Sequence, residues 1–186
     1  VKVTNIGVGT TDGPIVEIYH GGTYSTTYAV TTGGKVYGWG YNGGARLGLG
    51  DTTNRTAPTV LTALSGAIKI EVPSNGVYYN NAGSQTYEQT FALLSTGVVY
   101  GAGTDHNSYG IFGVGAAGTR NTWTAVSGVS GFTDIAHSGA YNQAMVGLSG
   151  TEVYGWGYNG TNGLDGLTTA AVLTPMKLSN VTGCLS

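Results

Sequence analysis

Three histidines, His20, His106 and His137, are the side chains in this sequence best suited to transfer protons near neutral pH or to bind a metal ion. They lie far apart in the sequence and do not follow the spacing of metal ligands. His20 and His137 both come just after a short apolar segment in two similar stretches of the chain. A position that recurs in this way is typical of a structural role in a turn or in packing. We take that interpretation over a ligand or a general base.

Asp105 and His106 are adjacent and could act as an acid and base pair, in a segment that ends at Tyr109. Catalysis would also need a nucleophile or a second carboxylate placed by the same motif, and the sequence shows neither. The segment is therefore predicted to be a solvated loop. Because it is inserted relative to an otherwise similar stretch of the chain, Asp105, His106 and Tyr109 are kept as candidate ligand-binding residues.

Two glycine strings, residues 48–50 and 113–115, superficially resemble a phosphate-binding loop. Such loops need a following helix and a lysine, and both are missing from the sequence here. We interpret the strings as turns. With no metal spacing, no phosphate loop and no catalytic set, we expect no cofactor, no metal and no enzymatic activity.

The segment from Pro73 to Gln89 is the strongest candidate for a binding site. It is an insertion of roughly ten residues relative to the rest of the repeated pattern, and insertions in repeat proteins collect on the binding face. Aromatic and amide side chains in it are suited to stacking and hydrogen bonding with a carbohydrate or a surface protein. The alternatives are a variable loop with no partner and a loop packed on a neighbouring subunit. The candidate residues are Tyr78, Tyr79, Asn80, Asn81 and Tyr87.

The elements that position these residues come from a repeat. The sequence Val-Tyr-Gly-Trp occurs at residues 36–39 and 153–156, with a weaker copy at 99–102. Around each copy we predict two short strands, a glycine-containing hairpin, a third strand, a glycine-rich loop and a last extended segment. No stretch has an apolar face at helical spacing, so the chain is predicted to be all-β. The predicted units are 1–14, the tail of a preceding repeat, 15–66, 67–131 with the insertion 73–89, and 132–186.

The first repeat resembles the repeat of the regulator of chromosome condensation family. That repeat reads roughly Trp-Gly-x-Asn-x-x-Gly-Gln-Leu-Gly-x-Gly-Asp followed by Pro, and residues 39–51 with Pro58 follow it closely. Ala45 stands in place of a Gly and Arg46 in place of a Gln. The second repeat keeps the glycines of 110–115 but has Ala102 in place of the Trp, and the third follows the pattern only through Asn159.

The resemblance implies a β-propeller of four-stranded blades, about three of them in this chain. Propellers typically have at least about four blades, so three would leave open sheets that belong to a larger propeller or assembly. Residues 1–6 match residues 176–181, which indicates that the chain begins at the tail of a preceding repeat. We expect an internal piece of a longer array, completed by other copies or other parts of a longer chain. The alternative is a processed short protein capped by its N-terminal strand.

The repeated tryptophans are predicted to pack between blades. Trp39 and Trp156 occupy the same position of the repeat, and a repeated aromatic is more typical of packing than of ligand stacking. The second repeat has Ala102 at this position. We expect Phe112 or Trp123 to fill the space there.

Composition excludes several kinds of partner and scaffold. Only 9% of the residues are charged, against about 25% in an ordinary domain, and the formal net charge is −2. Such a chain offers no electrostatic surface for nucleic acid. It also has no apolar run long enough for a membrane span. The single cysteine, Cys184, rules out a scaffold of internal disulfides.

The richness in Gly, Thr, Ser, Asn and Tyr is typical of adhesive proteins on surfaces. We therefore predict a non-enzymatic structural and adhesive propeller module on a phage tail fibre or a cell surface, with an extracellular or virion-surface location. The resemblance leaves two alternatives open. One is a secreted propeller that binds protein as an enzyme inhibitor, and the other is an intracellular exchange factor or scaffold, whose expected charged loops this chain lacks.

Overall fold

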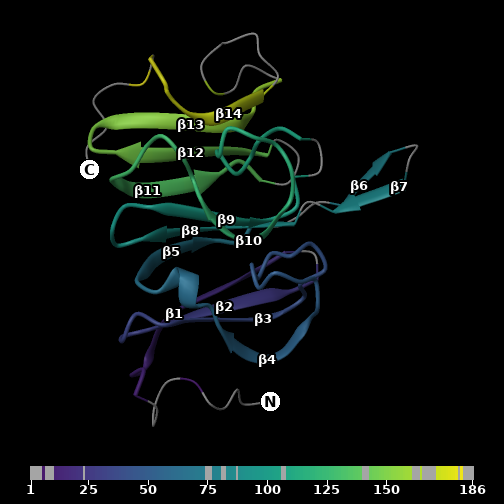
Figure 1. The fold of residues 1–186 in the computed structure, drawn as a ribbon, viewed down its shortest axis with the longest axis vertical. Helices are drawn as coiled ribbons and strands as arrows, with labels where there is room; N and C mark the ends of the chain where they lie inside the picture. The colour runs from purple at the N-terminus through teal and green to yellow at the C-terminus, as the bar shows by residue number, and fades with distance from the viewer. Residues whose placement is uncertain are drawn as a thin grey trace.

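The computed structural model describes residues 6, 11–22, 24–73, 77–80, 83–86, 88–105, 108–139, 143–160, 164, 171–179 and 181, with the backbone alone at 77–80 and 83–86. These residues form three four-stranded antiparallel sheets that lie one upon another (Figure 1). The predicted all-β fold of about three four-stranded blades is confirmed. Within the described residues, no helix is long and apolar enough to cross a membrane.

Each sheet is built from consecutive segments of one repeat, with an antiparallel order along the chain. Sheet 1 contains β1 (Ile15–Gly21), β2 (Thr26–Thr31), β3 (Val36–Gly40) and β4 (Arg55–Val60). Sheet 2 contains β5 (Ala67–Glu71), β8 (Gln89–Leu94), β9 (Val99–Gly103) and β10 (Arg120–Ala125). Sheet 3 contains β11 (Phe132–His137), β12 (Ala144–Ser149), β13 (Glu152–Tyr158) and β14 (Ala171–Lys177). A short 3-10 turn, η1 (Thr62–Leu64), leads from sheet 1 to sheet 2.

Strand register shows which positions of the three sheets are equivalent. In each sheet an isoleucine of the first strand pairs with a small residue of the second strand, which pairs with the tyrosine of the repeated motif. These rows are Ile18, Ala29 and Tyr37 in sheet 1, Ile70, Ala92 and Tyr100 in sheet 2, and Ile135, Gly147 and Tyr154 in sheet 3. Ile70 belongs to the core between sheets 1 and 2, and Ile135 to the core between sheets 2 and 3. This position of the repeat therefore faces the preceding sheet.

Tryptophan side chains fill the two spaces between the three sheets, as expected. Trp156 is fully buried between sheets 2 and 3, and its indole Nε1 donates to the Ile111 carbonyl at 2.9 Å. Trp123, on β10, packs with Ala102 between sheets 1 and 2 and donates to the Leu47 carbonyl at 2.9 Å. The prediction that Trp123 fills the space beside Ala102 is thus confirmed. Trp39 is only half-buried, because its register places it on the outer face of sheet 1, which no described sheet covers.

The glycine strings form turns through which the loop of one sheet contacts the last strand of the next sheet. Leu49 forms a β-bridge with Thr122, and the Gly50 N–H donates to the Asn121 carbonyl at 2.8 Å. A Cβ added at Gly48 would lie 2.5 Å from the Trp123 ring, and Gly48 has a φ of +62°. The glycine here is therefore required by both the turn and the close contact.

The insertion in the second repeat forms a separate hairpin. Its strands, β6 (Val77–Asn80) and β7 (Gly83–Thr86), form a two-stranded sheet between β5 and β8 in the chain. Figure 1 shows this hairpin standing out to the side of the three sheets. We call it the arm.

Candidate interaction surface at the loop edge

One edge of the molecule carries the arm and the loops that follow the third strand of each sheet. The first and third strands of every sheet end there and the second strand begins there, as the pairings Thr26 to Gly40 and Gln89 to Gly103 show. We call this the loop edge. Among the described residues it consists of 22, 24–25, 41–54, 72–73, 77–80, 83–86, 88, 104–105, 108–119, 138–139, 143 and 159–160.

Two tyrosine pairs lie on the loop edge. The ring centroids of Tyr24 and Tyr41 are 4.6 Å apart, and those of Tyr109 and Tyr158 are 4.5 Å apart. Tyr41 and Tyr158 have the same place in the repeat, and in each case the glycine two residues later makes room, since an added Cβ would collide with the phenol. Tyr24 remains 49% exposed. The edge therefore presents aromatic surface with polar tips, which suits protein contact.

A buried ionic pair lies next to Tyr41 of the first tyrosine pair. The Arg46 guanidinium lies 5.7 Å from the centre of the Tyr41 ring. Its Nη2 is 4.0 Å from Glu88 Oε1, and both side chains are almost completely buried. Burial lowers the pKa of Arg46, and the charge of Glu88 partly opposes that shift. Burial, and then Glu88, raise the pKa of the Tyr41 phenol.

Glu88 is also the residue that joins the arm to sheet 2. It precedes β8 directly and packs against Gly44, where an added Cβ would collide with the Glu88 carboxylate. The base of the arm is thereby fixed against the loop of sheet 1. Sequence reasoning missed this relationship, although Arg46 departs from the family repeat and Glu88 is the one charged residue of the insertion.

The polar contacts continue from sheet 2 to sheet 3. The Gln89 side-chain amide donates to the Thr104 carbonyl at 2.7 Å and to Gln143 Oε1 at 3.1 Å. Five of the six buried side-chain polar atoms that have no hydrogen-bond partner within the described residues belong to these two glutamines and the ionic pair. They are Arg46 Nε and Nη2, Glu88 Oε1, Gln89 Oε1 and Gln143 Nε2, and the sixth is His137 Nε2. Buried polar atoms are usually paired, so this polar seam is an exceptional part of the core.

Asp105 holds the loop of the second repeat together. Its Oδ1 accepts the Tyr109 N–H, and its Oδ2 accepts the N–H groups of Gly110 and Gly118, each at 3.0 Å. Asn42 occupies the same position in the first repeat, where its Oδ1 accepts the Leu47 N–H at 2.8 Å. The structure thus gives Asp105 a structural role, with Tyr109 packed on Tyr158. His106 lies outside the described residues.

The other sequence-predicted binding residues belong to the arm. Tyr78, Tyr79 and Asn80 lie on β6, in register with Gln85, Ser84 and Gly83 of β7. Asn81 and Tyr87 lie outside the described residues. Ligand binding by the arm stays a prediction.

The equivalent histidines take structural positions. His20 pairs with Thr27 in the strand register and its Nδ1 lies 2.9 Å from Thr27 Oγ1. His137 pairs with Met145, its Nδ1 accepts the Gly139 N–H at 2.9 Å, and burial lowers its pKa to about 4. Among the described residues, no group of three His, Cys, Asp or Glu could hold a metal ion.

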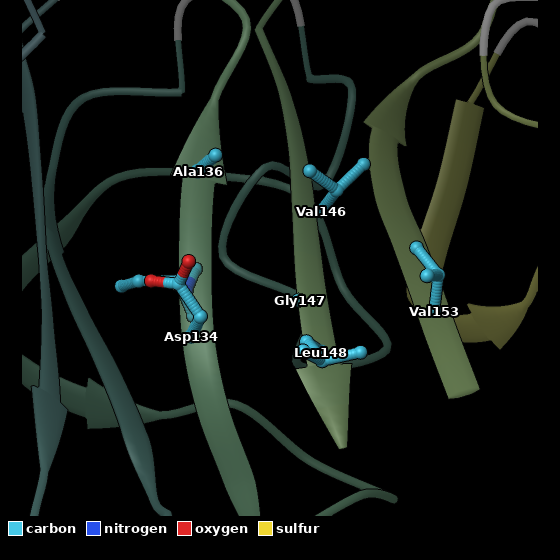
Figure 2. A pocket seen from close by; sticks show the side chains of 7 residues that line it. Asp134, Ala136, Val146, Gly147, Leu148 and Val153 are labelled. Carbon is cyan, nitrogen blue, oxygen red and sulfur yellow. The ribbon is translucent and has the colours of Figure 1, made fainter. Parts of the chain in front are cut away.

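The outer face of sheet 3 is a second feature of the molecule. It contains an apolar hollow of about 190 Å³, shown in Figure 2. Val146 lies there at the position that the fully buried Tyr28 and Phe91 occupy in sheets 1 and 2. The other side chains around the hollow include Ala136, Leu148, Val153 and Asp134. The hollow exists because a small side chain replaces an aromatic one on a face that no described sheet covers.

Known proteins share this fold and parts of this sequence. Residues 33–75 match the family model described as the Regulator of chromosome condensation (RCC1) repeat. The Ultraviolet-B receptor UVR8 of Arabidopsis thaliana is 29% identical over 133 residues, which cover 72% of this chain and 27% of the receptor. The E3 ubiquitin-protein ligase HERC2 of Homo sapiens is 31% identical over 140 residues, which cover 73% of this chain and 3% of the ligase. The chain therefore spans about a quarter or less of these relatives.

Two solved structures show the same fold. Human WBSCR16 matches 89% of this chain with a TM-score of 0.64 and 23% identity, over 38% of its own chain. Prp20p of Saccharomyces cerevisiae, whose structure was described with its binding to Gsp1p and histones, matches 87% with a TM-score of 0.59 and 20% identity, also over 38% of its own chain.

The expected extracellular or virion-surface location is wrong. UVR8, HERC2 and Prp20p, which resemble the chain in sequence or in fold, are nuclear or cytosolic proteins. The prediction rested on low charge and on a content rich in Gly, Thr, Ser, Asn and Tyr. Composition alone does not determine the cellular location of a protein. None of these proteins is a phage fibre.

Proposed function

From the premise that this chain carries repeats of the regulator of chromosome condensation family, we propose that it is a non-enzymatic protein-binding segment of an intracellular propeller, of the exchange-factor or scaffold type. The observation that carries the proposal is the loop edge, where the arm and two tyrosine pairs lie near a buried ionic pair; Tyr24 is exposed and the other three rings are partly exposed. The binding of Prp20p to Gsp1p and histones supports a protein partner over a carbohydrate.

The proposed contact surface combines the tyrosine pairs, residues 105–109 and the arm with Tyr78, Tyr79, Asn80, Asn81 and Tyr87. Apart from buried groups, this surface has few charges. Binding there rests on stacking, apolar burial and hydrogen bonds. Affinity should therefore change little with ionic strength, unlike that of a protein that neutralises phosphates.

The two outer faces have a separate proposed role in assembly. Ile18 is 63% exposed on sheet 1, whereas the equivalent Ile70 and Ile135 are 3% and 1% exposed. The hollow on the outer face of sheet 3 likewise lies at Val146, whose equivalents in sheets 1 and 2, Tyr28 and Phe91, are fully buried. We propose that further repeats, from another part of a longer chain or from other copies, cover both faces, with unit boundaries at 14/15, 66/67 and 131/132.

Binding to purified Gsp1p and to histones tests the proposed function. The chain is immobilised and each protein is passed over it at 50 and 300 mM salt. We expect binding to at least one of them, a small change of affinity with salt, and a loss of at least tenfold when Tyr24 and Tyr158 are both changed to Ser. Thr96→Ser, in an exposed turn at the opposite edge, is the matched control.

Two results would contradict the proposal. No binding to either protein would remove the support for an exchange-factor or scaffold type. Binding that survives the two tyrosine substitutions, or is lost equally in Thr96→Ser, would place the contact away from the loop edge.

A further inference from the structure

The arm has strand edges that are not paired within the described part of the chain. β6 and β7 hydrogen-bond to each other in a sheet of two, while each of the three main sheets contains four strands. A hairpin of two strands is at best marginally stable by itself in water. Its outer edges present unpaired N–H and C=O groups, which are ready to accept another strand.

The arm also lacks the usual protection of an exposed edge. Natural proteins block such edges with charged residues or a proline within the strand. Residues 74–87 contain no charged residue and no proline, since Pro73 precedes the arm and Glu88 is buried at its base. The edge is therefore open to pairing, and two copies of it do not repel each other.

The composition of the two strands favours one edge. β6 reads Val-Tyr-Tyr-Asn and β7 reads Gly-Ser-Gln-Thr. Valine and tyrosine are enriched in strands, whereas glycine is depleted. We propose that the outer edge of β6 pairs antiparallel with β6 of a second copy of this chain, which gives a four-stranded sheet across a two-fold axis.

The register of this pairing follows from the sequence. A two-fold axis between two antiparallel strands is perpendicular to the sheet and keeps each side chain on its own face, so the opposed residues must lie on the same face. With the axis beside residue 78, Tyr78 stands opposite Tyr78 of the other copy, and Val77 stands opposite Tyr79. Aromatic residues directly opposite each other in an antiparallel pair stabilise it. The interface is isologous, so it closes at two copies instead of propagating into a fibre.

The structure also gives the arm the position that such a contact needs. Figure 1 shows it standing clear of the three sheets, so a second copy can approach its edge. Its base is fixed, because Glu88 is buried beside Arg46 and Gly44 and because β8 begins at Gln89 within sheet 2. The pairing goes beyond the proposed function, since it uses the backbone edge of β6 and leaves the tyrosine pairs and the two faces of the arm to the partner protein.

Directed disulfide crosslinking tests the register in the full chain. Cys184 is first changed to Ser, and Tyr78→Cys and Tyr79→Cys are then made in separate chains. Residue 78 and its own copy are directly opposite each other and lie within disulfide reach, whereas residue 79 and its own copy are offset by about 7 Å along the strands and lie beyond it. We expect Tyr78→Cys chains to give at least tenfold more disulfide-linked dimer than Tyr79→Cys chains, as measured by non-reducing electrophoresis.

Three results would overturn the inference. One is equal crosslinking of the Tyr78→Cys and Tyr79→Cys chains. Another is efficient crosslinking within Ser84→Cys chains or within Gln85→Cys chains, which would place the contact on β7. The third comes from sedimentation of the unmodified chain: either it stays a monomer throughout, or its dimer persists after residues 74–86 are replaced by a short glycine turn. A persistent dimer would show that the outer faces of sheets 1 and 3 cause the association, without bearing on the partner-binding test.

Discussion

Arg46, in the loop between β3 and β4, and Glu88, directly before β8, face each other in the core at 4.0 Å, a distance too long for a direct hydrogen bond. Both charges are removed from water, and neither Arg46 Nη2 nor Glu88 Oε1 has a hydrogen-bond partner within the described residues. A buried pair of this kind contributes little net stability, but either charge alone would be very unfavourable.

Changing one member of this pair should therefore cost more than changing both. We expect Arg46→Gln, which restores the residue usual in the repeat, or Glu88→Gln to lower the free energy of unfolding by about 3 to 5 kcal/mol each. The double variant should recover at least half of that loss. Urea denaturation of the four proteins measures the coupling, and strictly additive losses would show that the two charges act independently.

The two repeated tryptophans should respond differently to truncation. Trp156→Ala removes a fully buried ring between sheets 2 and 3 and should cost about 3 to 5 kcal/mol. Trp39→Ala should cost much less in this chain, because Trp39 is half-buried on an uncovered face. The thermal unfolding midpoints of both variants test this difference, and equal midpoints would contradict the placement of Trp39.

The sequence predicted most of the fold because the signals are local. Gly34, Gly97 and Gly150 all have positive φ in the hairpin turns where glycine was expected. Trp123 was predictable because Ala102 left a space of known position in the repeat. In contrast, the Arg46 and Glu88 contact joins residues 42 positions apart in sequence through the packing of two sheets. The tyrosine pairs also depend on loop geometry, which no periodic pattern encodes.

The pH dependence of stability should contain a contribution from His137. Burial lowers its pKa in the folded chain to about 4 from the usual 6.5, so the unfolded chain binds a proton more readily between these values. The contribution is fully present above pH 6.5 and is lost as the pH falls from 6.5 to 4. It amounts to about 3 kcal/mol.

Replacing the ring should remove this part of the acid sensitivity. We expect His137→Gln to reduce the loss of stability between pH 7 and pH 4.5, measured from urea midpoints at both values. His20→Gln is the matched control, since His20 occupies the equivalent strand position but is exposed and bonded to Thr27. An unchanged pH dependence in His137→Gln would mean that His137 is not held in its neutral form by the fold.

Substitution of equivalent isoleucines should have different effects on stability at the outer face of sheet 1 and in the core between sheets 1 and 2. Ile70→Asn should strongly destabilise the chain, because this side chain is 3% exposed between sheets 1 and 2. Ile18→Asn should leave the unfolding midpoint within about 0.5 kcal/mol of the original, since Ile18 is 63% exposed on the outer face of sheet 1. The same change should weaken any association through that face, as should Val146→Glu at the hollow of sheet 3. Sedimentation velocity over a range of concentrations separates the two effects, and association unaffected by both Ile18→Asn and Val146→Glu would show that these faces do not bind further repeats.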